Sequence, residues 1–272
     1  MIKFEHVTKS YGAKHVLTDI NFVIENGKIT SLVGKNGAGK STTINIASKY
    51  INASGGTITN HSISVMPDAD NLYRDMTGKH FLKFMAKLKK VPTTTEITNL
   101  TNELGLSDNL NKKIKDYSFG MKKKIAFIQA YMGNYDTYIF DEPTSGVDYE
   151  SAEIMMAYLR KLAQRDKAVL LTSHNLDEIS EISDHIIFLA NGLTVEKQEA
   201  LSHKTAFLLL TFADKPEQLT ALGFKKMKDN VYHIETEPDQ INHLLQTVIN
   251  AKINIKEFKL AKSEIASTLD SI

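Results

Sequence analysis

The 272-residue chain contains no cysteine, which excludes disulfides, thiolate metal ligands and cysteine nucleophiles. Long apolar runs are also missing. The run at residues 206–210 is far shorter than the roughly 20 residues that a membrane-spanning helix needs. The first ten residues, MIKFEHVTKS, lack the apolar stretch of a signal peptide, which predicts a cytoplasmic protein. If the protein works at a membrane, we expect it at the inner face, with another chain spanning the bilayer.

An excess of charge of either sign is missing too. The 33 basic and 32 acidic residues leave a net charge of +1, which gives no reason to expect nucleic acid as a partner. The length suits one sizeable domain plus a smaller one. Glycine becomes scarce after about Glu199, where Gly223 is the last one. This shift in composition predicts a large domain at residues 1–200 and a small one at 201–272.

The clearest positive feature is a phosphate-binding loop. Residues 34–41 read GKNGAGKS and fit G-x-x-x-x-G-K-[ST] at every fixed position. A β-prone run at 29–33 precedes the loop, and a helix-compatible run at 41–50 follows it. Glycines let the backbone wrap around phosphate oxygens, while N–H groups and the helix N-terminus face the anion. The alternative, a glycine-rich turn that matches by chance, is disfavoured by this strand–loop–helix context.

Each part of the loop has an expected role in holding a nucleotide. Lys40 would reach the β- and γ-phosphates, and the Ser41 hydroxyl would ligate Mg²⁺. The loop residues expected to contact the nucleotide are Gly34, Lys35, Asn36, Gly37, Ala38, Gly39, Lys40, Ser41 and Thr42.

The rest of the chain alternates between strand and helix patterns. Alternating apolar residues at 2–24 predict antiparallel strands, and short strands are expected at 56–59 and 63–66. From 72 to 132 the period becomes helical, with Phe81, Phe84, Met85 and Leu88 on one predicted face and Ile97, Leu100, Thr101 and Leu104 on another. Strands at 138–140, 169–172 and 186–189 then alternate with helices at 149–164 and 176–183. This alternation predicts a parallel sheet with helices on its faces.

The segment after residue 200 has its own short pattern. It predicts strands at 207–212, 231–235 and 253–260 and helices at 238–250 and 262–271. We interpret it as a small α/β appendage without a catalytic motif.

Two acids end one of the predicted buried strands. Asp141 and Glu142 directly follow the apolar run 138–140. In P-loop enzymes a strand-end aspartate helps to hold Mg²⁺, and in-line attack on the γ-phosphate needs an acceptor that orients the water. We therefore assign the metal ion to Asp141 and the attacking water to Glu142. The alternative is an acidic pair of the kind that commonly ends strands, which the phosphate loop disfavours.

The segment between these motifs carries a family resemblance. Residues 117–121 (Tyr-Ser-Phe-Gly-Met) resemble the signature of the ATP-binding cassette (ABC) ATPases, usually L-S-G-G-Q. Ser118 and Gly120 match this signature, whereas Tyr117, Phe119 and Met121 depart from it. A serine hydroxyl and a glycine amide at a helix N-terminus can donate to a γ-phosphate. The alternative is that Ser118 simply caps a helix whose lysines face solvent.

Further matches follow in the family's order, so that the resemblance covers roughly residues 2–200. Residues 145–148 (Ser-Gly-Val-Asp) resemble the D-loop, and His174 resembles the switch histidine, which contacts the γ-phosphate. Tyr11 stands where the family places an aromatic residue that stacks on adenine, with Val16 beside the base. Simple packing is the alternative for Tyr11, and a structural role is the alternative for His174.

One position departs from the family in a way that matters chemically. The family normally carries a glutamine at the end of the strand expected at 63–66, and the matching position here is Asp68, after Pro67. An ionised aspartate only accepts hydrogen bonds and is shorter than glutamine. We carry Asp68 over as a metal contact.

The resemblance implies a complete architecture and activity. The expected fold is α/β: a P-loop NTPase core of the ABC ATPase type, an N-terminal antiparallel β subdomain, a helical signature subdomain at about residues 72–135 and the C-terminal α/β appendage. The appendage is similar to extensions of some drug, bacteriocin and lipid exporter ATPases. The implied activity is ATP hydrolysis with Mg²⁺, with Glu142, His174 and Lys40 as catalytic groups.

The resemblance also implies partners. It predicts a head-to-tail homodimer or heterodimer in which each ATP lies between one chain's phosphate loop and the other chain's Ser118 and Gly120. A separate membrane permease would carry the exported substrate, docking beside Asp68 and residues 72–88. The apolar stripe of residues 72–88 is equally compatible with the core of the helical subdomain.

Three other functions are considered. A soluble ABC ATPase that acts on ribosomes or DNA usually has two cassettes or a long coiled-coil insertion, and neither is visible here. A GTPase switch would need the guanine-binding motif N-K-x-D, which is absent from the sequence. A catalytically impaired regulatory cassette would bind ATP without turnover, which Glu142 and His174 disfavour.

Overall fold

The computed structural model of the chain describes residues 1–59, 61–92, 94–190, 192–197, 206–212, 218–228, 231–236, 240–250, 253 and 255–261. It divides into two compact units, which are described separately below. The first consists of Met1–Asn175 with Ile182–Gln198, and the second of Leu176–Glu181 with Glu199–Ile272. No helix within the described residues is long and apolar enough to cross a membrane.

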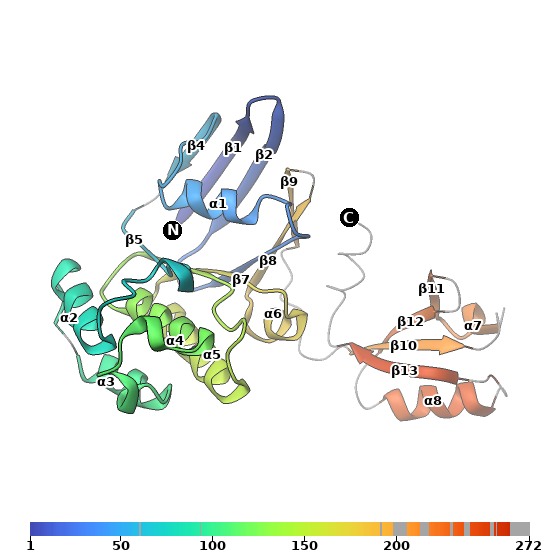
Figure 1. Cartoon of the computed structure of the whole chain (residues 1–272). Helices are drawn as coiled ribbons and strands as arrows, with labels where there is room; N and C mark the ends of the chain where they lie inside the picture. The colour runs from blue at the N-terminus through green and yellow to red at the C-terminus, as the bar shows by residue number, and fades with distance from the viewer. Residues whose placement is uncertain are drawn as a thin grey trace. The chain divides into compact units, whose positions relative to one another are not determined.

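The first unit is built on a nine-stranded sheet with the order β4-β1-β2-β9-β8-β3-β7-β6-β5 (Figure 1). Strands β8, β3, β7, β6 and β5 run parallel to one another, which confirms the predicted parallel sheet. Strand β9 was not predicted; it pairs antiparallel with β8. The strands are β1 (Ile2–Tyr11), β2 (Lys14–Ile24), β3 (Ile29–Val33), β4 (Gly55–Thr59), β5 (Ile63–Val65), β6 (Thr137–Asp141), β7 (Ala168–Thr172), β8 (His185–Ala190) and β9 (Leu193–Lys197).

The central strands are buried along almost their whole length because both faces of the sheet are covered. In β6, Tyr138 and Phe140 pack into the core beneath the helices, while Ile139 packs into a second core on the opposite face. Successive side chains of a strand point to opposite faces, so a strand buried on both sides reads as a continuous apolar run. The antiparallel pair β1–β2 belongs to the second core, where the rings of Phe4 and Phe22 stack with centroids 4.3 Å apart.

Helix α1 (Lys40–Ala47) follows the phosphate loop and is shorter than predicted. It ends before Lys49, which has a φ of 60° and therefore leaves the helical region. The N–H of Tyr50 donates to the carbonyl of Asn45, and that of Lys49 donates to Ile46, closing the helix in a Schellman motif. Glycine usually occupies this left-handed position, so a lysine there gave no signal in the sequence.

The helices of the signature region form a layer in which α2 and α3 each pack against α4 (Figure 1). The predicted face of α3 is confirmed, because Ile97, Leu100, Thr101 and Leu104 are all buried. The predicted face of α2 was partly wrong: Leu88 is 62% exposed, and the buried side consists of Phe81, Leu82 and Ala86. The bounds are α2 (Gly78–Leu88), α3 (Thr95–Glu103), α4 (Phe119–Tyr131) and the 3₁₀ turns η1 (Ala69–Asn71), η2 (Ser107–Asn109) and η3 (Ile114–Asp116).

Helix α5 (Tyr149–Gln164) has the predicted bounds, and Asp148 caps its first turn by accepting from the Ser151 N–H. Helix α6 (Leu176–Ile182) ends one residue earlier than predicted.

The second unit contains a four-stranded sheet with the order β11-β12-β10-β13, in which all pairs are antiparallel. Its core includes Leu219, Phe224, Tyr232 and Val248. The sequence pattern missed β11 and α7, and the helix expected at 262–271 lies outside the described residues. The elements are β10 (Ala206–Phe212), α7 (Gln218–Ala221), β11 (Lys225–Lys228), β12 (Val231–Thr236), α8 (Ile241–Asn250) and β13 (Ile255–Ala261).

One ion pair joins α5 to the central sheet of the first unit. Arg160 Nη1 lies 2.9 and 2.8 Å from the two carboxylate oxygens of Asp184, and Nη2 donates to the carbonyl of Ile182. Asp184 also accepts from the N–H of Ile29 at 2.7 Å, where β3 begins. The pair therefore fixes the start of the strand that leads into the phosphate loop.

We expect Arg160→Met to lower the free energy of unfolding by about 1.5–3 kcal/mol, the range for hydrogen bonds to charged groups. Urea-induced unfolding measures this. Arg160→Lys keeps the charge but loses the planar fork of the guanidinium group, so its stability should lie between those of the wild type and the methionine variant. A methionine variant as stable as the wild type would contradict a role for this pair.

Candidate nucleotide-binding site

A cavity of about 440 Å³ opens where the central parallel strands end. Its wall combines the loop after β3, the end of β6 and the segment after β7, which meet because parallel strands present their carboxyl ends on one edge. The lining residues are Tyr11, Lys14, Val16, Asn36, Gly37, Gly39, Lys40, Ser41, Thr42, Asp141, Glu142 and His174.

The phosphate loop has the backbone that its glycines were expected to allow. Gly37 and Gly39 have φ values of 83° and 110°, a region that other residues rarely adopt. Gly34 allows close packing, because a Cβ there would lie 2.4 Å from the carbonyl oxygen of Leu189. Gly39 is the N-cap of α1 and supplies no side-chain acceptor, so the first amides of the helix face the cavity edge unmasked. Such a terminus favours an anion.

The ammonium group of Lys40 folds back onto its own loop. Nζ donates to the carbonyl of Gly34 at 2.6 Å and to that of Lys35 at 3.3 Å. Burial lowers the pKa of Lys40, and the negative charges of Glu142 and Asp141 act against that shift. The present partners of this cation are neutral carbonyls, which phosphate oxygens can replace.

Asp141 and Glu142 are held by the neighbouring strand. Thr172 at the end of β7 donates its hydroxyl to Asp141 Oδ1, and its Oγ1 accepts from the Glu142 N–H at 3.0 Å. Glu142 has a φ of 49°, a left-handed conformation that is uncommon for a residue with a side chain. This turn directs the carboxylate of Glu142 into the cavity that Asp141 also lines.

His174 contacts the same carboxylate. The main-chain N–H of His174 donates to Glu142 Oε2 at 3.3 Å. The ring Nε2 lies 3.3 Å from Oε1 without hydrogen-bond geometry. Burial raises the pKa of Glu142 above its usual value, and the nearby His174 acts in the opposite direction. A buried carboxylate oxygen without a hydrogen bond is costly unless another ligand is meant to use it.

The two residues expected at the adenine both line the cavity. Tyr11 is 51% exposed, and the ammonium of Lys9 sits 5.0 Å from its ring centroid. Val16 is partly buried and lies in the opposite strand of the same hairpin. Lys14 also lines the cavity. It was not among the predicted residues, because a lone lysine beside a hairpin turn is typical of a solvated charge.

Some predicted residues do not line this cavity. Gly34, Lys35 and Ala38 belong to the loop without facing the space, whereas Ser118, Gly120 and Asp68 lie elsewhere. Asp68 caps η1 by accepting from the Asp70 N–H at 3.0 Å. Ser118 caps α4 by accepting from the Met121 N–H at 3.2 Å, so the simple capping role is real. The metal role of Asp68 and the nucleotide role of Ser118 stay predictions.

The donor set suits a magnesium ion brought by a nucleotide. Among the residues that the structure describes, no three His, Asp or Glu side chains gather into a self-sufficient metal site. Mg²⁺ is commonly held by only one or two protein oxygens together with phosphates and water. Ser41 and Asp141, which both line the cavity, fit that requirement.

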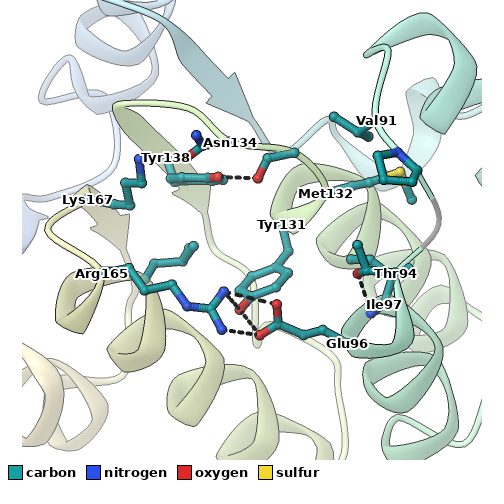
Figure 2. Close-up of a pocket in the computed structure, with 13 residues that line it drawn as sticks. Val91, Thr94, Glu96, Ile97, Tyr131, Met132, Asn134, Tyr138, Arg165 and Lys167 are labelled. Atoms are coloured by element: carbon teal, nitrogen blue, oxygen red, sulfur yellow. Dashed lines mark hydrogen bonds and ion pairs between the residues drawn. The ribbon is translucent and has the colours of Figure 1, made fainter.

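A second cavity of about 250 Å³ lies between the ends of α3, α4 and α5 (Figure 2). Arg165 donates to both carboxylate oxygens of Glu96, at 3.0 and 2.6 Å, and Tyr131 donates to Glu96 at 2.7 Å. The Arg165 hydrogen bond lowers the pKa of Glu96 below its usual value. The charged and polar groups beside this cavity are already paired with one another. Because they come from α3, α4 and the end of α5, we call the Glu96–Tyr131–Arg165 network the joint between the helical layer and the core.

The first cavity and its elements define the class of protein: a P-loop nucleotide hydrolase. The family model described as ABC transporter matches residues 17–145. The ABC transporter ATP-binding protein MJ1023 of Methanocaldococcus jannaschii is 34% identical over 213 residues, which cover 76% of this chain and 81% of that protein. The chain therefore belongs to the ATP-binding proteins of ABC transporters and is an ATPase, as the sequence analysis predicted.

Two further comparisons agree with this assignment. The linearmycin resistance ATP-binding protein LnrL of Bacillus subtilis is 28% identical over 242 residues, covering 83% of this chain and 76% of that protein. The fold matches the dimeric post-hydrolysis structure of the ATP-binding cassette MJ0796 bound to ADP and Pi. That match has a TM-score of 0.65 at 22% identity and covers 72% of this chain and 98% of the other. The predicted ABC ATPase fold is confirmed.

Because of the ion pair between Glu96 and Arg165 in this joint, we expect part of the protein's stability to depend on pH. Because the pKa of Glu96 is lowered by folding, its contribution is present above the unfolded pKa of about 4.3 and is lost as the pH falls through the folded value. We expect Glu96→Gln to be less stable than the wild type at pH 7, with the difference shrinking as the pH is lowered below the unfolded pKa. Unfolding curves across that range test this, and a difference that is constant with pH would count against the ion pair.

Proposed function

We propose that the protein hydrolyses ATP in this cavity to drive export through a separate membrane permease. The observation that carries the proposal is the convergence of Lys40, Asp141, Glu142 and His174 on one space beside a phosphate-binding loop. These groups come from three separate segments, and their chemistry is that of γ-phosphoryl transfer to water.

The loop and its lysine account for binding. We infer that the phosphates replace Gly34 and Lys35 as partners of the Lys40 ammonium, since a charged acceptor binds it more strongly than a carbonyl. Tyr11 can stack on adenine because half of its surface is exposed. Ser41 and Asp141 would hold Mg²⁺, which neutralises phosphate charge when bound.

Glu142 is the proposed group that orients the attacking water. Its pKa is raised by burial, which brings a carboxylate closer to the proton affinity that a general base needs near neutral pH. His174 lies against the same carboxylate, so it can steady Glu142 and contact the γ-phosphate from the adjoining segment.

The proposed active form is a head-to-tail dimer. Ser118 and Gly120 do not line the cavity of their own chain, which fits a contribution to the site of a partner. The aromatic rings of Phe119 and Tyr149, beside the signature and the D-loop, are 48% and 80% exposed. ATP would favour the closed dimer because its γ-phosphate bonds both chains, and hydrolysis would release them. Homodimer and heterodimer are equally compatible with these features.

The proposals that the protein powers export and that it lies at the membrane are based on its similarity to other ABC transporter proteins. LnrL is named for linearmycin resistance, which supports an exported substrate for this chain as well. A peripheral position at the inner face of the membrane follows if a permease supplies the spanning helices. The helix α2 and the Asp68 segment remain the proposed docking region, although most of the α2 stripe is used in the subdomain's own core.

We expect Glu142→Gln to lower kcat for ATP hydrolysis at least about 100-fold, the usual contribution of a general base. ATP binding should persist, and ATP should now stabilise a dimer. Phosphate release, nucleotide titration and light scattering measure these three properties. Glu153→Gln, an exposed change on α5, is the matched control. Undiminished turnover in Glu142→Gln would remove Glu142 from this role.

We expect Lys40→Met to weaken ATP binding at least about tenfold, because a charge-assisted contact to phosphate is lost. Direct titration with ATP and Mg²⁺ measures the affinity, and circular dichroism checks that the variant is folded. Lys87→Met on the exposed side of α2 serves as the control. An unchanged affinity in Lys40→Met would refute the assignment of the phosphate loop.

A further inference from the structure

Lys123 on α4 is a buried lysine that the proposed reaction does not use. Its surface is 8% exposed, and it does not line the nucleotide cavity. Its Nζ donates to the main-chain carbonyl of Glu142 at 2.8 Å. Burying an ammonium is unfavourable unless it is well paired. This contact is therefore a specific one.

The main chain of Glu142 needs such support because its φ of 49° is an uncommon conformation for a non-glycine residue. Its N–H is held from β7, by the carbonyl and the hydroxyl of Thr172 at 3.2 and 3.0 Å. Its carbonyl is held from the other side by Lys123, with a longer bond of 3.4 Å from the Ser145 N–H. The residue is thus clamped between a strand of the core and a helix of the signature layer.

We propose that Lys123 is a positioning residue for ATP hydrolysis: it holds the left-handed turn at Glu142 so that the carboxylate faces the cavity. This inference rests on the proposed role of Glu142. The N-cap of the same helix is the signature residue Ser118, so Lys123 also ties the signature segment to the main chain of Glu142 in its own chain. A displacement of α4 would pull directly on the carbonyl of Glu142.

The three consecutive lysines of α4 have different environments. Lys124 forms an ion pair with Asp148 at 2.7 Å, next to the start of α5. Lys122 is partly exposed. Lys123 makes one further contact, with its ammonium 5.8 Å from the ring centroid of Phe119. Of these three lysines, Lys123 is the one that donates to the carbonyl of Glu142. Its proposed role therefore depends on the length and charge of the side chain as well as on packing.

The test compares Lys123→Met, Lys123→Arg and the control Lys122→Met. Methionine keeps most of the apolar stem and removes the donor, whereas arginine keeps a charged donor. We expect Lys123→Met to lower kcat between about 10- and 100-fold, because small misplacements of a reacting group have effects of that size. The affinity for ATP and Mg²⁺ in a direct titration should stay within about twofold, since the phosphate loop is untouched. Lys123→Arg should recover most of kcat, and Lys122→Met should match the wild type.

Two results would overturn the inference: wild-type kcat in Lys123→Met, or an equal loss of kcat in the methionine and arginine variants, which would indicate packing. If Lys123→Met does not fold, Lys123→Gln replaces it, with a shorter amide that should support a lower kcat than arginine does. Glu142→Gln, measured in parallel, separates the two proposals. If it abolishes turnover while Lys123→Met does not lower kcat, only the positioning role fails; if it retains turnover, the proposed role of Glu142 fails first.

Discussion

The nucleotide cavity depends on the register of the parallel strands β3, β7 and β6. In that register Asp141 stands opposite Thr172, and Ser31 stands opposite Leu171, so the phosphate loop, the acidic pair and His174 emerge on one edge. A slip of one residue would turn each side chain to the other face of the sheet. The two apolar cores prevent such a slip, because the alternating residues of β6 fill both of them.

Two polar contacts connect the signature helices to the rest of the first unit, in addition to their apolar packing. Lys123 holds the main chain of Glu142 near the cavity, and the Arg165–Glu96–Tyr131 network joins α3 and α4 to the end of α5 far along the helices. The first attachment is a single hydrogen bond from Lys123 to a strained turn, and the second is a partly exposed ion pair beside a cavity. Because α4 also packs into the core that β6 lines, a displacement of this helix would act through the Lys123 bond on the main chain of Glu142, the residue proposed to orient the water.

The elements with a regular pattern were predictable, and the exceptions share a cause. The central strands and α5 follow from apolar runs and caps that act over a few residues. The end of α1 before Lys49 could not be predicted, because it depends on a left-handed backbone conformation at that lysine. The exposure of Leu88 could not be predicted either, because it depends on what the neighbouring elements cover. Strand β9 was missed because its short run is stabilised mainly by pairing with β8.

The sequence alone determined the chemistry of the site: a phosphate loop, two strand-end acids and a histidine are recognisable because their spacing reflects local geometry. Tertiary structure decided which of these groups share a space, and it added Lys14 and the Lys123 contact while leaving Asp68 at the cap of a 3₁₀ turn. Sequence motifs reflect interactions within a few residues, and such interactions can be predicted from the sequence. The position of a buried lysine or of a strand-end carboxylate depends instead on partners that are distant in the chain.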